Sequence, residues 1–459
     1  MTLISLPNEL IEHIASYLDL PSIRSLRLTT SSITRATSHL FRDRFFYQHT
    51  LTWTKQSLDT LVEISLHPNY GTALRHLIIN ATPQHSMHFW RLRKSISEID
   101  DISTPYGGVK PSAQRQLEAE QVLAEQKIKE TTTFFNETRY DQKMLKQAFS
   151  NLSKLPGGSS LTRLTFLYNG LSAAYSGGSP LYCQLSQCEM SRPFVSTLAA
   201  LASSPDIHIS DILLSRDAPH GAVSIGRLES LAPSLTAFDK AFASLQHLAL
   251  NLRDWRRPDG GFTLPTSTTT TRPPFIVRFL SKATHLRSLE LSCFSWLDPD
   301  LFTQIARLCV FPDLQSLKLS VLSLSSAQAL SNFLMPAMSK DLRCLKIRHV
   351  LLVDREVEWD DWLAWLASIG TGTASTVQGE AKDEDRTRSG TGITHLCIAD
   401  LFRPMNEVIH FQGKRGLCFG EDWASRLRMT LEDEGVEVSE SRLVWSMGAF
   451  AYPFVGLSM

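Results

Sequence analysis

Leu286-Arg-Ser-Leu289-Glu-Leu291 is the first of three evenly spaced copies of one leucine phrase in the 459-residue chain. The second copy is Leu314-Gln-Ser-Leu317-Lys-Leu319 and the third is Leu342-Arg-Cys-Leu345-Lys-Ile347, so successive copies begin 28 residues apart. Apolar residues that alternate in this way are typical of a strand with one buried face. Apolar stretches between the phrases predict helices over 275–280, 301–308 and 327–334. The spacing therefore predicts a repeated unit of one strand and one helix.

Further copies of the phrase extend the pattern in both directions along the chain. They begin at Leu74, Leu161, Leu245 and Ile393. The gaps from Leu245 to Leu286 and from Leu342 to Ile393 exceed the 28-residue step by 13 and by 23 residues, and the earlier copies are more widely spaced. These two gaps each contain a stretch rich in Thr, Pro, Gly or Ser, near 256–274 and 370–392. We interpret these two stretches as flexible loops inserted in a regular array.

A step of 28 residues lies within the range typical of leucine-rich repeats, in which strands stack side by side. The pattern therefore predicts an α/β fold, an irregular leucine-rich-repeat solenoid with parallel strands and outer helices. The alternative interpretation is that the phrases are ordinary buried strands of another α/β sheet, because parallel strands also read as apolar runs.

Residues 6–41, LPNELIEHIASYLDLPSIRSLRLTTSSITRATSHLF, predict three short helices. Asn8 stands where it would cap the first helix, a second is expected to begin near Ser22, and a third covers 33–41. One apolar face of the first helix is marked by residues at helical spacing, Leu10, Ile14 and Leu18. Three such helices bury too little surface to be stable alone, so their apolar faces need a partner or the rest of the chain.

The same stretch closely resembles the F-box motif. The matching positions are Leu6-Pro7-Asn8-Glu9-Leu10-Ile11, Ile14, Tyr17-Leu18, Pro21, Ile23 and Leu26-Arg27-Leu28. The resemblance covers residues 5–41, and it departs from many F-boxes where this chain has Thr29-Thr30 and Ile33 in place of Cys and Trp. In that family the Leu-Pro start and the following helices dock on the Skp-type adaptor of a cullin–RING ubiquitin ligase. The resemblance thus implies an adaptor contact made by Leu6, Pro7, Leu10, Ile14, Leu18 and Ile23.

These patterns together predict three regions. We expect an F-box over 1–45, a first repeat with a charged amphipathic helical insertion over 46–155, and irregular leucine-rich repeats over 156–459. The insertion reads as one long or two shorter amphipathic helices over 112–152. We interpret it as a solvated helix that lies on the array, and a partner-binding helix is the alternative.

The composition limits the classes of partner and compartment. With 46 Lys and Arg against 46 Asp and Glu, the net charge is zero, which gives no electrostatic reason to expect binding to nucleic acid or to a membrane surface. The seven cysteines show no disulfide framework, and the N-terminus lacks the basic and apolar segments of a signal peptide. We therefore expect a protein of the cytoplasm or nucleus without membrane segments.

No motif for catalysis or for binding a cofactor or metal stands out. The chain has no P-loop, no Gly-x-Ser-x-Gly elbow, no His-Glu-x-x-His and no Cys-x-x-Cys pair, so we expect a non-enzyme without cofactor or metal. In the leucine phrase the x positions point away from the core. On the three regular copies they form a candidate target-binding patch, suited to an acidic or phosphorylated segment, that includes Arg287, Glu290, Lys318, Arg343 and Lys346.

The resemblance and the repeats together predict a substrate-recognition subunit of an SCF-type (Skp–cullin–F-box) ubiquitin ligase. Its F-box would bind the Skp-type adaptor, and through it the cullin–RING ligase, while its repeats would bind an unknown target protein. One alternative is an adaptor-binding scaffold without a role in ubiquitylation. Another is an unrecognised enzyme on a leucine-rich α/β fold.

Overall fold

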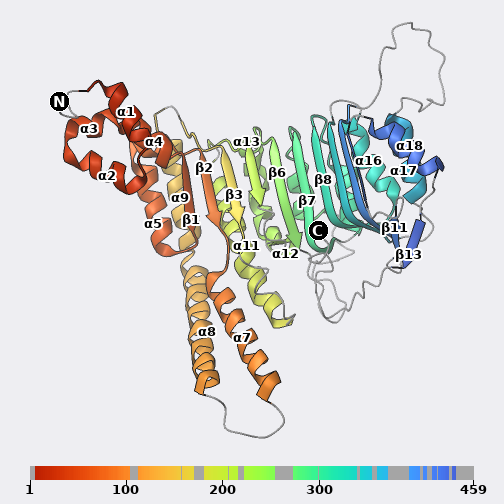
Figure 1. Ribbon diagram of the computed structural model, residues 1–459, viewed down its shortest axis with the longest axis horizontal. Helices are drawn as coiled ribbons and strands as arrows, with labels where there is room; N and C mark the ends of the chain where they lie inside the picture. The colour runs from red at the N-terminus through yellow and green to blue at the C-terminus, as the bar shows by residue number, and fades with distance from the viewer. Residues whose placement is uncertain are drawn as a thin grey trace.

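The structure, a computed structural model, shows a mixed α/β fold built on one long, mostly parallel sheet (Figure 1). This confirms the predicted α/β class with parallel strands. The residues that it describes are 6–103, 112–156, 158–169, 180–204, 206–214, 222–253, 272–297, 299–338, 342–353, 359–370, 392–403, 407–410, 416–420, 422–433 and 437–440.

Residues 6–46 form four helices at one end of the molecule (Figure 1), namely α1 Asn8–Ser16, α2 Leu20–Thr29, α3 Ser31–Ala36 and α4 Ser38–Phe45. The expected third helix is two helices, because the backbone departs from helical geometry at Thr37. The expected cap by Asn8 is also wrong, since Pro7 precedes α1 without a side-chain cap. The carboxylate of Asp19 instead caps α2 by accepting from the Ser22 N–H at 3.0 Å. Hydrogen bonds from the side chain and the backbone of Ser22 lower the pKa of Asp19.

Thirteen strands of the described residues share the sheet, in the spatial order β1-β2-β3-β4-β6-β7-β8-β9-β10-β11-β13, with β5 on β6 and β12 on β10. The strands β1 to β10 pair in parallel, whereas β11, β12 and β13 are antiparallel additions at the end. Their bounds are β1 Gln48–Thr52, β2 His76–Asn80, β3 Arg163–Leu167, β4 Asp211–Leu214, β5 Val223–Ser224, β6 His247–Arg253, β7 Ser288–Leu297, β8 Ser316–Leu324, β9 Cys344–Leu352, β10 His395–Arg403, β11 Glu407–His410, β12 Gly416–Phe419 and β13 Glu437–Glu440.

All seven leucine phrases lie on parallel strands, which confirms the strands expected from the spacing. The second leucines of the three regular copies, Leu289, Leu317 and Leu345, stand side by side in the sheet and are fully buried. The sequence did not predict β1 or β4, which carry no such phrase. It also missed the antiparallel strands at the end of the sheet.

Helices join the strands and cover the leucine side of the sheet with one continuous apolar core. The predicted helix over 275–280 coincides with α14, and those over 301–308 and 327–334 lie inside α15 and α16. The bounds are α5 Lys55–Leu66, α6 Pro68–Gly71, α7 Gln84–Ser103, α8 Ser112–Thr138, α9 Tyr140–Ser153, α11 Pro180–Ala202, α12 Ile225–Leu228, the 3₁₀ helix η2 Glu229–Ala237, α13 Phe238–Ala241, α14 Phe275–Leu280, α15 Pro299–Leu308, α16 Ala327–Met338, α17 Trp359–Gly370 and α18 Trp423–Asp433.

Three neighbouring strands carry the same backbone kink. Val321 in β8, His349 in β9 and Asp400 in β10 have left-handed φ values of 58°, 54° and 51°. The residues before and after them remain paired across the sheet, so the three kinks lie at equivalent positions. A left-handed backbone is uncommon for residues other than glycine, and a β-branched valine rarely adopts it.

The helical insertion departs from its expected position. It forms two helices, α8 and α9, that are separated at Arg139, where φ is 52°. Helix α9 packs on α5 and α11, but α8 pairs with α7 in a hairpin that projects away from the sheet (Figure 1). The interpretation of the insertion as a helix lying on the array is therefore correct for α9 and wrong for α8.

At the base of the hairpin Glu189 of α11 accepts hydrogen bonds from Ser86 and Thr132, and burial raises the pKa of Glu189.

The expectations on the two loops, on membrane segments and on the cysteines have different outcomes. Of the two expected loops, residues 254–271 and 371–391 lie outside the described part of the chain. None of the described helices is both long and apolar enough to cross a membrane. Cys397 of β10 and Cys418 of β12 face each other on antiparallel strands and form a disulfide, which the spacing of the cysteines did not indicate.

Candidate functional site

An exposed apolar stripe runs along α1. Pro7 is exposed at its start, and Leu10, Ile14 and Tyr17 follow with 48%, 41% and 76% of their surface exposed. Their spacing of three, four and three residues brings all four to one side of the helix. An apolar face that the rest of the protein leaves uncovered is the usual mark of a docking surface. Of these four, the sequence had indicated Pro7, Leu10 and Ile14.

The other residues implied by the F-box resemblance face inward. Leu6 packs against the buried Ile11 and Ile33, and Leu18 packs in a second small core. Ile23 is fully buried in that second core, so the expectation that its side chain contacts a partner is wrong for this conformation. Leu18, two residues past the end of α1, is half-buried, although helical spacing had placed it on the face of Leu10 and Ile14.

Helix α2 adds one exposed apolar residue that the sequence had matched to the motif but not assigned to the site. Leu28 is 87% exposed, the highest value among the large apolar residues of the described chain. Its exposure was not evident from the sequence, because the Leu-x-Leu step does not reveal which leucine faces the core. Leu26, two residues earlier, packs inward against both small cores.

The N-terminal helices are attached to the sheet by a cluster of aromatic rings. Phe46, which follows α4, stacks on Tyr70 of α6 with ring centroids 4.0 Å apart, and Phe41 meets the same ring edge-on at 6.4 Å. Arg44 of α4 donates to the carbonyl oxygens of Ser16 and Leu18 at 2.7 and 2.9 Å. These contacts hold the exposed stripe of α1 in a defined orientation with respect to the first strands.

The second candidate surface is the side of the sheet opposite the leucines, which we call the open face and define by alternate residues of β7, β8 and β9. Glu290, Lys318 and Lys346 stand side by side on these strands, in register. Lys318 Nζ lies 3.6 Å from Glu290 Oε2. The predicted alternation of core and surface positions is therefore confirmed for these residues, and one of the expected cations is already paired with the expected acid.

The two predicted arginines lie at the entrance of the strands. Arg287 and Arg343 are exposed and precede β7 and β9, where the Arg287 N–H donates to the Gln246 carbonyl and the Arg343 N–H to the Gln315 carbonyl, both at 2.8 Å. Sequence reasoning missed Arg348, an exposed residue of β9 that lies two positions after Lys346 and just beyond the leucine phrase. Arg287, Lys318, Arg343, Lys346 and Arg348 thus give the open face five basic side chains beside Glu290.

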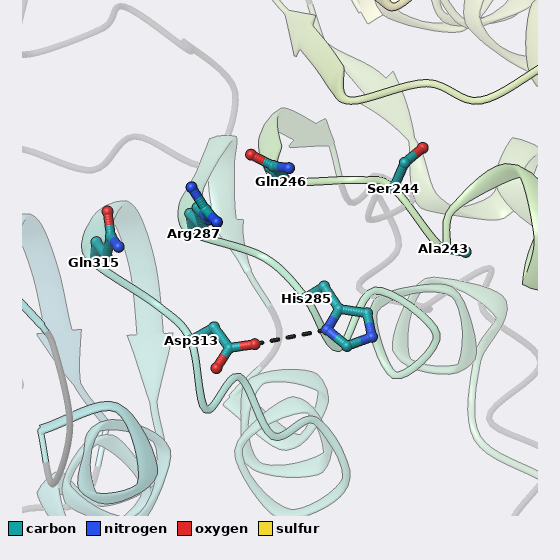
Figure 2. A pocket seen from close by; sticks show the side chains of 7 residues that line it. All are labelled: Ala243, Ser244, Gln246, His285, Arg287, Asp313 and Gln315. Carbon is teal, nitrogen blue, oxygen red and sulfur yellow. Dashed lines mark ion pairs between the residues drawn. The ribbon is translucent and has the colours of Figure 1, made fainter.

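A shallow polar hollow of about 440 Å³ opens beside this surface, at the entrances of β6, β7 and β8 (Figure 2). The side chains of Gln246, Arg287 and Gln315 stand in a row, each one residue before the start of its strand. Below them, His285 Nδ1 lies 3.6 Å from Asp313 Oδ2, and both side chains are well exposed. An arginine flanked by two amides offers several hydrogen-bond donors to a carboxylate or phosphate group.

The hollow also contains a serine, a histidine and an aspartate, which raises the question of a hydrolase triad. The Ser244 hydroxyl donates to the Ile209 carbonyl at 3.1 Å, so it does not point to the histidine. A nucleophilic serine requires a hydrogen bond to its base. The arrangement therefore supports binding of an anion rather than acyl transfer. In the described part of the chain no three His, Cys, Asp or Glu side chains form a group able to hold a metal ion.

Searches among protein-family models and among curated proteins find no match to the chain.

Proposed function

We propose that the protein is the non-catalytic substrate-recognition subunit of an SCF-type ubiquitin ligase, with an F-box over the N-terminal helices and irregular leucine-rich repeats in the sheet and its helices. The observation that carries this proposal is the exposed stripe of Pro7, Leu10, Ile14 and Tyr17 on α1. It lies on the helix that the F-box resemblance assigns to the Skp-type adaptor. A small helical unit with an uncovered apolar face is also what adaptor docking requires.

The attachment of the N-terminal helices to the sheet also supports a receptor role. Ubiquitin transfer by such a ligase depends on holding a lysine of the target near the loaded conjugating enzyme, and the receptor contributes orientation and effective concentration. The stacked pair Phe46 and Tyr70 packs the N-terminal helices against α6, beside the first strands of the sheet. Adaptor and target would then be held at opposite parts of one continuous sheet.

Charged replacements on the α1 stripe test the adaptor contact. We expect Leu10→Asp combined with Ile14→Asp to weaken adaptor binding by at least about 100-fold, because each apolar side chain buried at an interface is worth roughly 1.5–3 kcal/mol. The measurement is co-expression with an adaptor–cullin complex followed by size-exclusion chromatography. Val310→Asp combined with Met429→Asp is the control, since Val310 and Met429 are equally exposed but lie outside the N-terminal helices. Co-elution of the α1 variant at wild-type stoichiometry would refute the proposal.

The open face is proposed to bind the target through an acidic or phosphorylated segment. Targets are identified first, as proteins that persist in affinity purifications of the Leu10→Asp, Ile14→Asp variant when the proteasome is inhibited, while the adaptor is lost. A ubiquitylation assay with such a target separates a receptor from an adaptor-binding scaffold.

Reversing three charges of the open face should abolish recovery of these targets. We expect Lys318→Glu, Arg343→Glu and Lys346→Glu together to eliminate target binding and to spare adaptor binding, since like charges then face the acidic segment. Wild-type binding should also weaken with salt, because exposed charges are screened over about 8–10 Å. The control is Arg307→Glu, an exposed residue of α15. Unchanged recovery with the triple variant would exclude the open face as the target site.

A further inference from the structure

The outer side of the projecting helix α8 is apolar at its centre. Val122 and Leu123 are 64% and 57% exposed. Ala124 and Phe135, which are buried, mark the opposite side of the helix, where α8 meets α7 and the body of the protein. Val122 and Leu123 therefore point away from the hairpin, on a helix that stands clear of the sheet (Figure 1).

Charged residues flank this centre in an ordered way. On the two flanks Glu118 and Glu120 lie five and three residues before Leu123, and Lys127 and Lys129 lie four and six residues after it. Another acid, Glu125, lies two residues after Leu123. Glu118 and Lys129 are 11 residues apart, close to three helical turns, so they flank one side of the centre. Glu120 and Lys127 are seven residues apart, close to two turns, and flank the other side.

A second copy of α8 that runs antiparallel complements this pattern. With Leu123 of both copies at the crossing point, Glu118 lies level with Lys129 of the other copy, and Glu120 with Lys127, to within about 1.5 Å along the axis. The same crossing brings Arg115 level with Glu130 to within about the same distance. A parallel pairing in register would instead bring each of these charges next to a charge of the same sign. In the antiparallel pairing Glu125 lies level with Gln121 of the other copy and so meets no like charge there. The flanking charges Glu118, Glu120, Lys127 and Lys129 are thus self-complementary in the antiparallel direction.

We propose that the protein forms a two-fold dimer through the outer face of α8, with Val122 and Leu123 at the centre and the charged pairs on both flanks. Such an interface uses the same patch on both copies, so it closes at two subunits. One helix face is small compared with the interfaces of permanent dimers, so the association is reversible and concentration-dependent. The proposal is independent of the proposed ligase function.

Sedimentation velocity of the full-length chain from about 1 to about 100 µM tests the association. The expected result is a rise of the mass from 51.5 kDa toward twice that value. Leu123→Glu should hold the mass at 51.5 kDa over the whole range. Val310→Glu, a similarly exposed position outside the hairpin, should behave as wild type. A wild-type chain that stays monomeric throughout overturns the proposal.

Charge exchange tests the direction of pairing. Lys127→Glu with Lys129→Glu makes both flanks acidic, and Glu118→Lys with Glu120→Lys makes both basic, so each variant alone should show a dimer dissociation constant at least about 10-fold higher than wild type. An equimolar mixture of the two variants should regain the association. Lys143→Glu with Lys146→Glu, two exposed lysines of α9, is the matched control and should leave the dimer unchanged. Failure of the mixture to associate would exclude this pairing.

Oxidative cross-linking locates the two-fold axis. A Leu123→Cys chain should form a covalent dimer, because the two cysteines meet at the crossing point. An Arg115→Cys chain should not, because its two cysteines would be separated by roughly 24 Å along the axis at about 1.5 Å per residue. The wild-type chain, with its native cysteines, gives the background. Cross-linking at 115 but not at 123 would show a different interface and overturn the proposal.

Discussion

Replacing Asp141 by Ala is expected to lower the free energy of unfolding by about 3–5 kcal/mol, because it leaves the largely buried Arg192 guanidinium without its carboxylate partner. Asp141 of α9 is fully buried. It accepts from Arg192 Nε at 2.7 Å and from Arg192 Nη2 at 3.1 Å, and the Ser196 hydroxyl donates to it at 2.8 Å. Arg192 also donates to Asn136 Oδ1 at 2.6 Å, so it ties α11 to both α9 and the end of α8.

Urea unfolding, followed by circular dichroism, measures this loss. The control is Asp239→Ala, which removes an exposed ion pair with Lys282 and should cost less than about 1 kcal/mol. Asp141→Leu combined with Arg192→Met should recover much of the stability, because an apolar pair leaves no buried charge. A loss below about 1 kcal/mol for Asp141→Ala would mean that the pair does not hold α9 against α11.

A loss of similar size is expected when Phe279 of α14 is replaced by Ala. Phe279 is 1% exposed, and its ring centroid lies 5.0 Å from that of Phe242, 5.6 Å from Phe275 and 6.0 Å from Phe238. Removing a phenyl ring from such a cluster leaves a cavity and typically costs about 3–5 kcal/mol. Calorimetric unfolding should show the decrease, and Phe279→Leu should retain more than half of the lost stability, since it fills most of the space. Equal losses for both variants would contradict a cavity as the cause.

The repeated strands were predictable because their signal is local and strong. Each leucine phrase supplies two apolar residues on one face of a strand and a third just before the strand, and the neighbouring copies supply the partners. Strand β4 also has a parallel partner on each side, β3 and β6. Its own sequence offers only Ile212 and Leu214 over four residues, which is too short a pattern to recognise alone. Its position is set by β3 and β6 rather than by its own sequence.

For the candidate surfaces, helical and strand periodicity predicted which residues share a face, but not what that face contacts. Helical spacing shows that Leu10 and Ile14 share a face, but it does not show whether that face meets solvent or the core. Ile23 illustrates this limit, since its side chain fills the small core between the N-terminal helices. The helix α8 illustrates it again, because the amphipathic pattern does not reveal that the inner face meets α7 instead of the sheet. The pairing of Cys397 with Cys418 depends on the antiparallel pairing of β12 with β10, which no local sequence pattern predicts.

The shared kink of β8, β9 and β10 bears on how such a chain can lengthen or shorten during evolution. Val321, His349 and Asp400 bend their strands at one level, and the pairing of these three strands resumes in the same register beyond the bend. A duplicated segment that spans one full 28-residue step brings its own bend to the right level and its leucines to the buried side. A copy one residue shorter or longer would shift the bend and turn the leucines outward. Whole units are thus the pieces that unequal recombination can add or remove here without loss of the sheet.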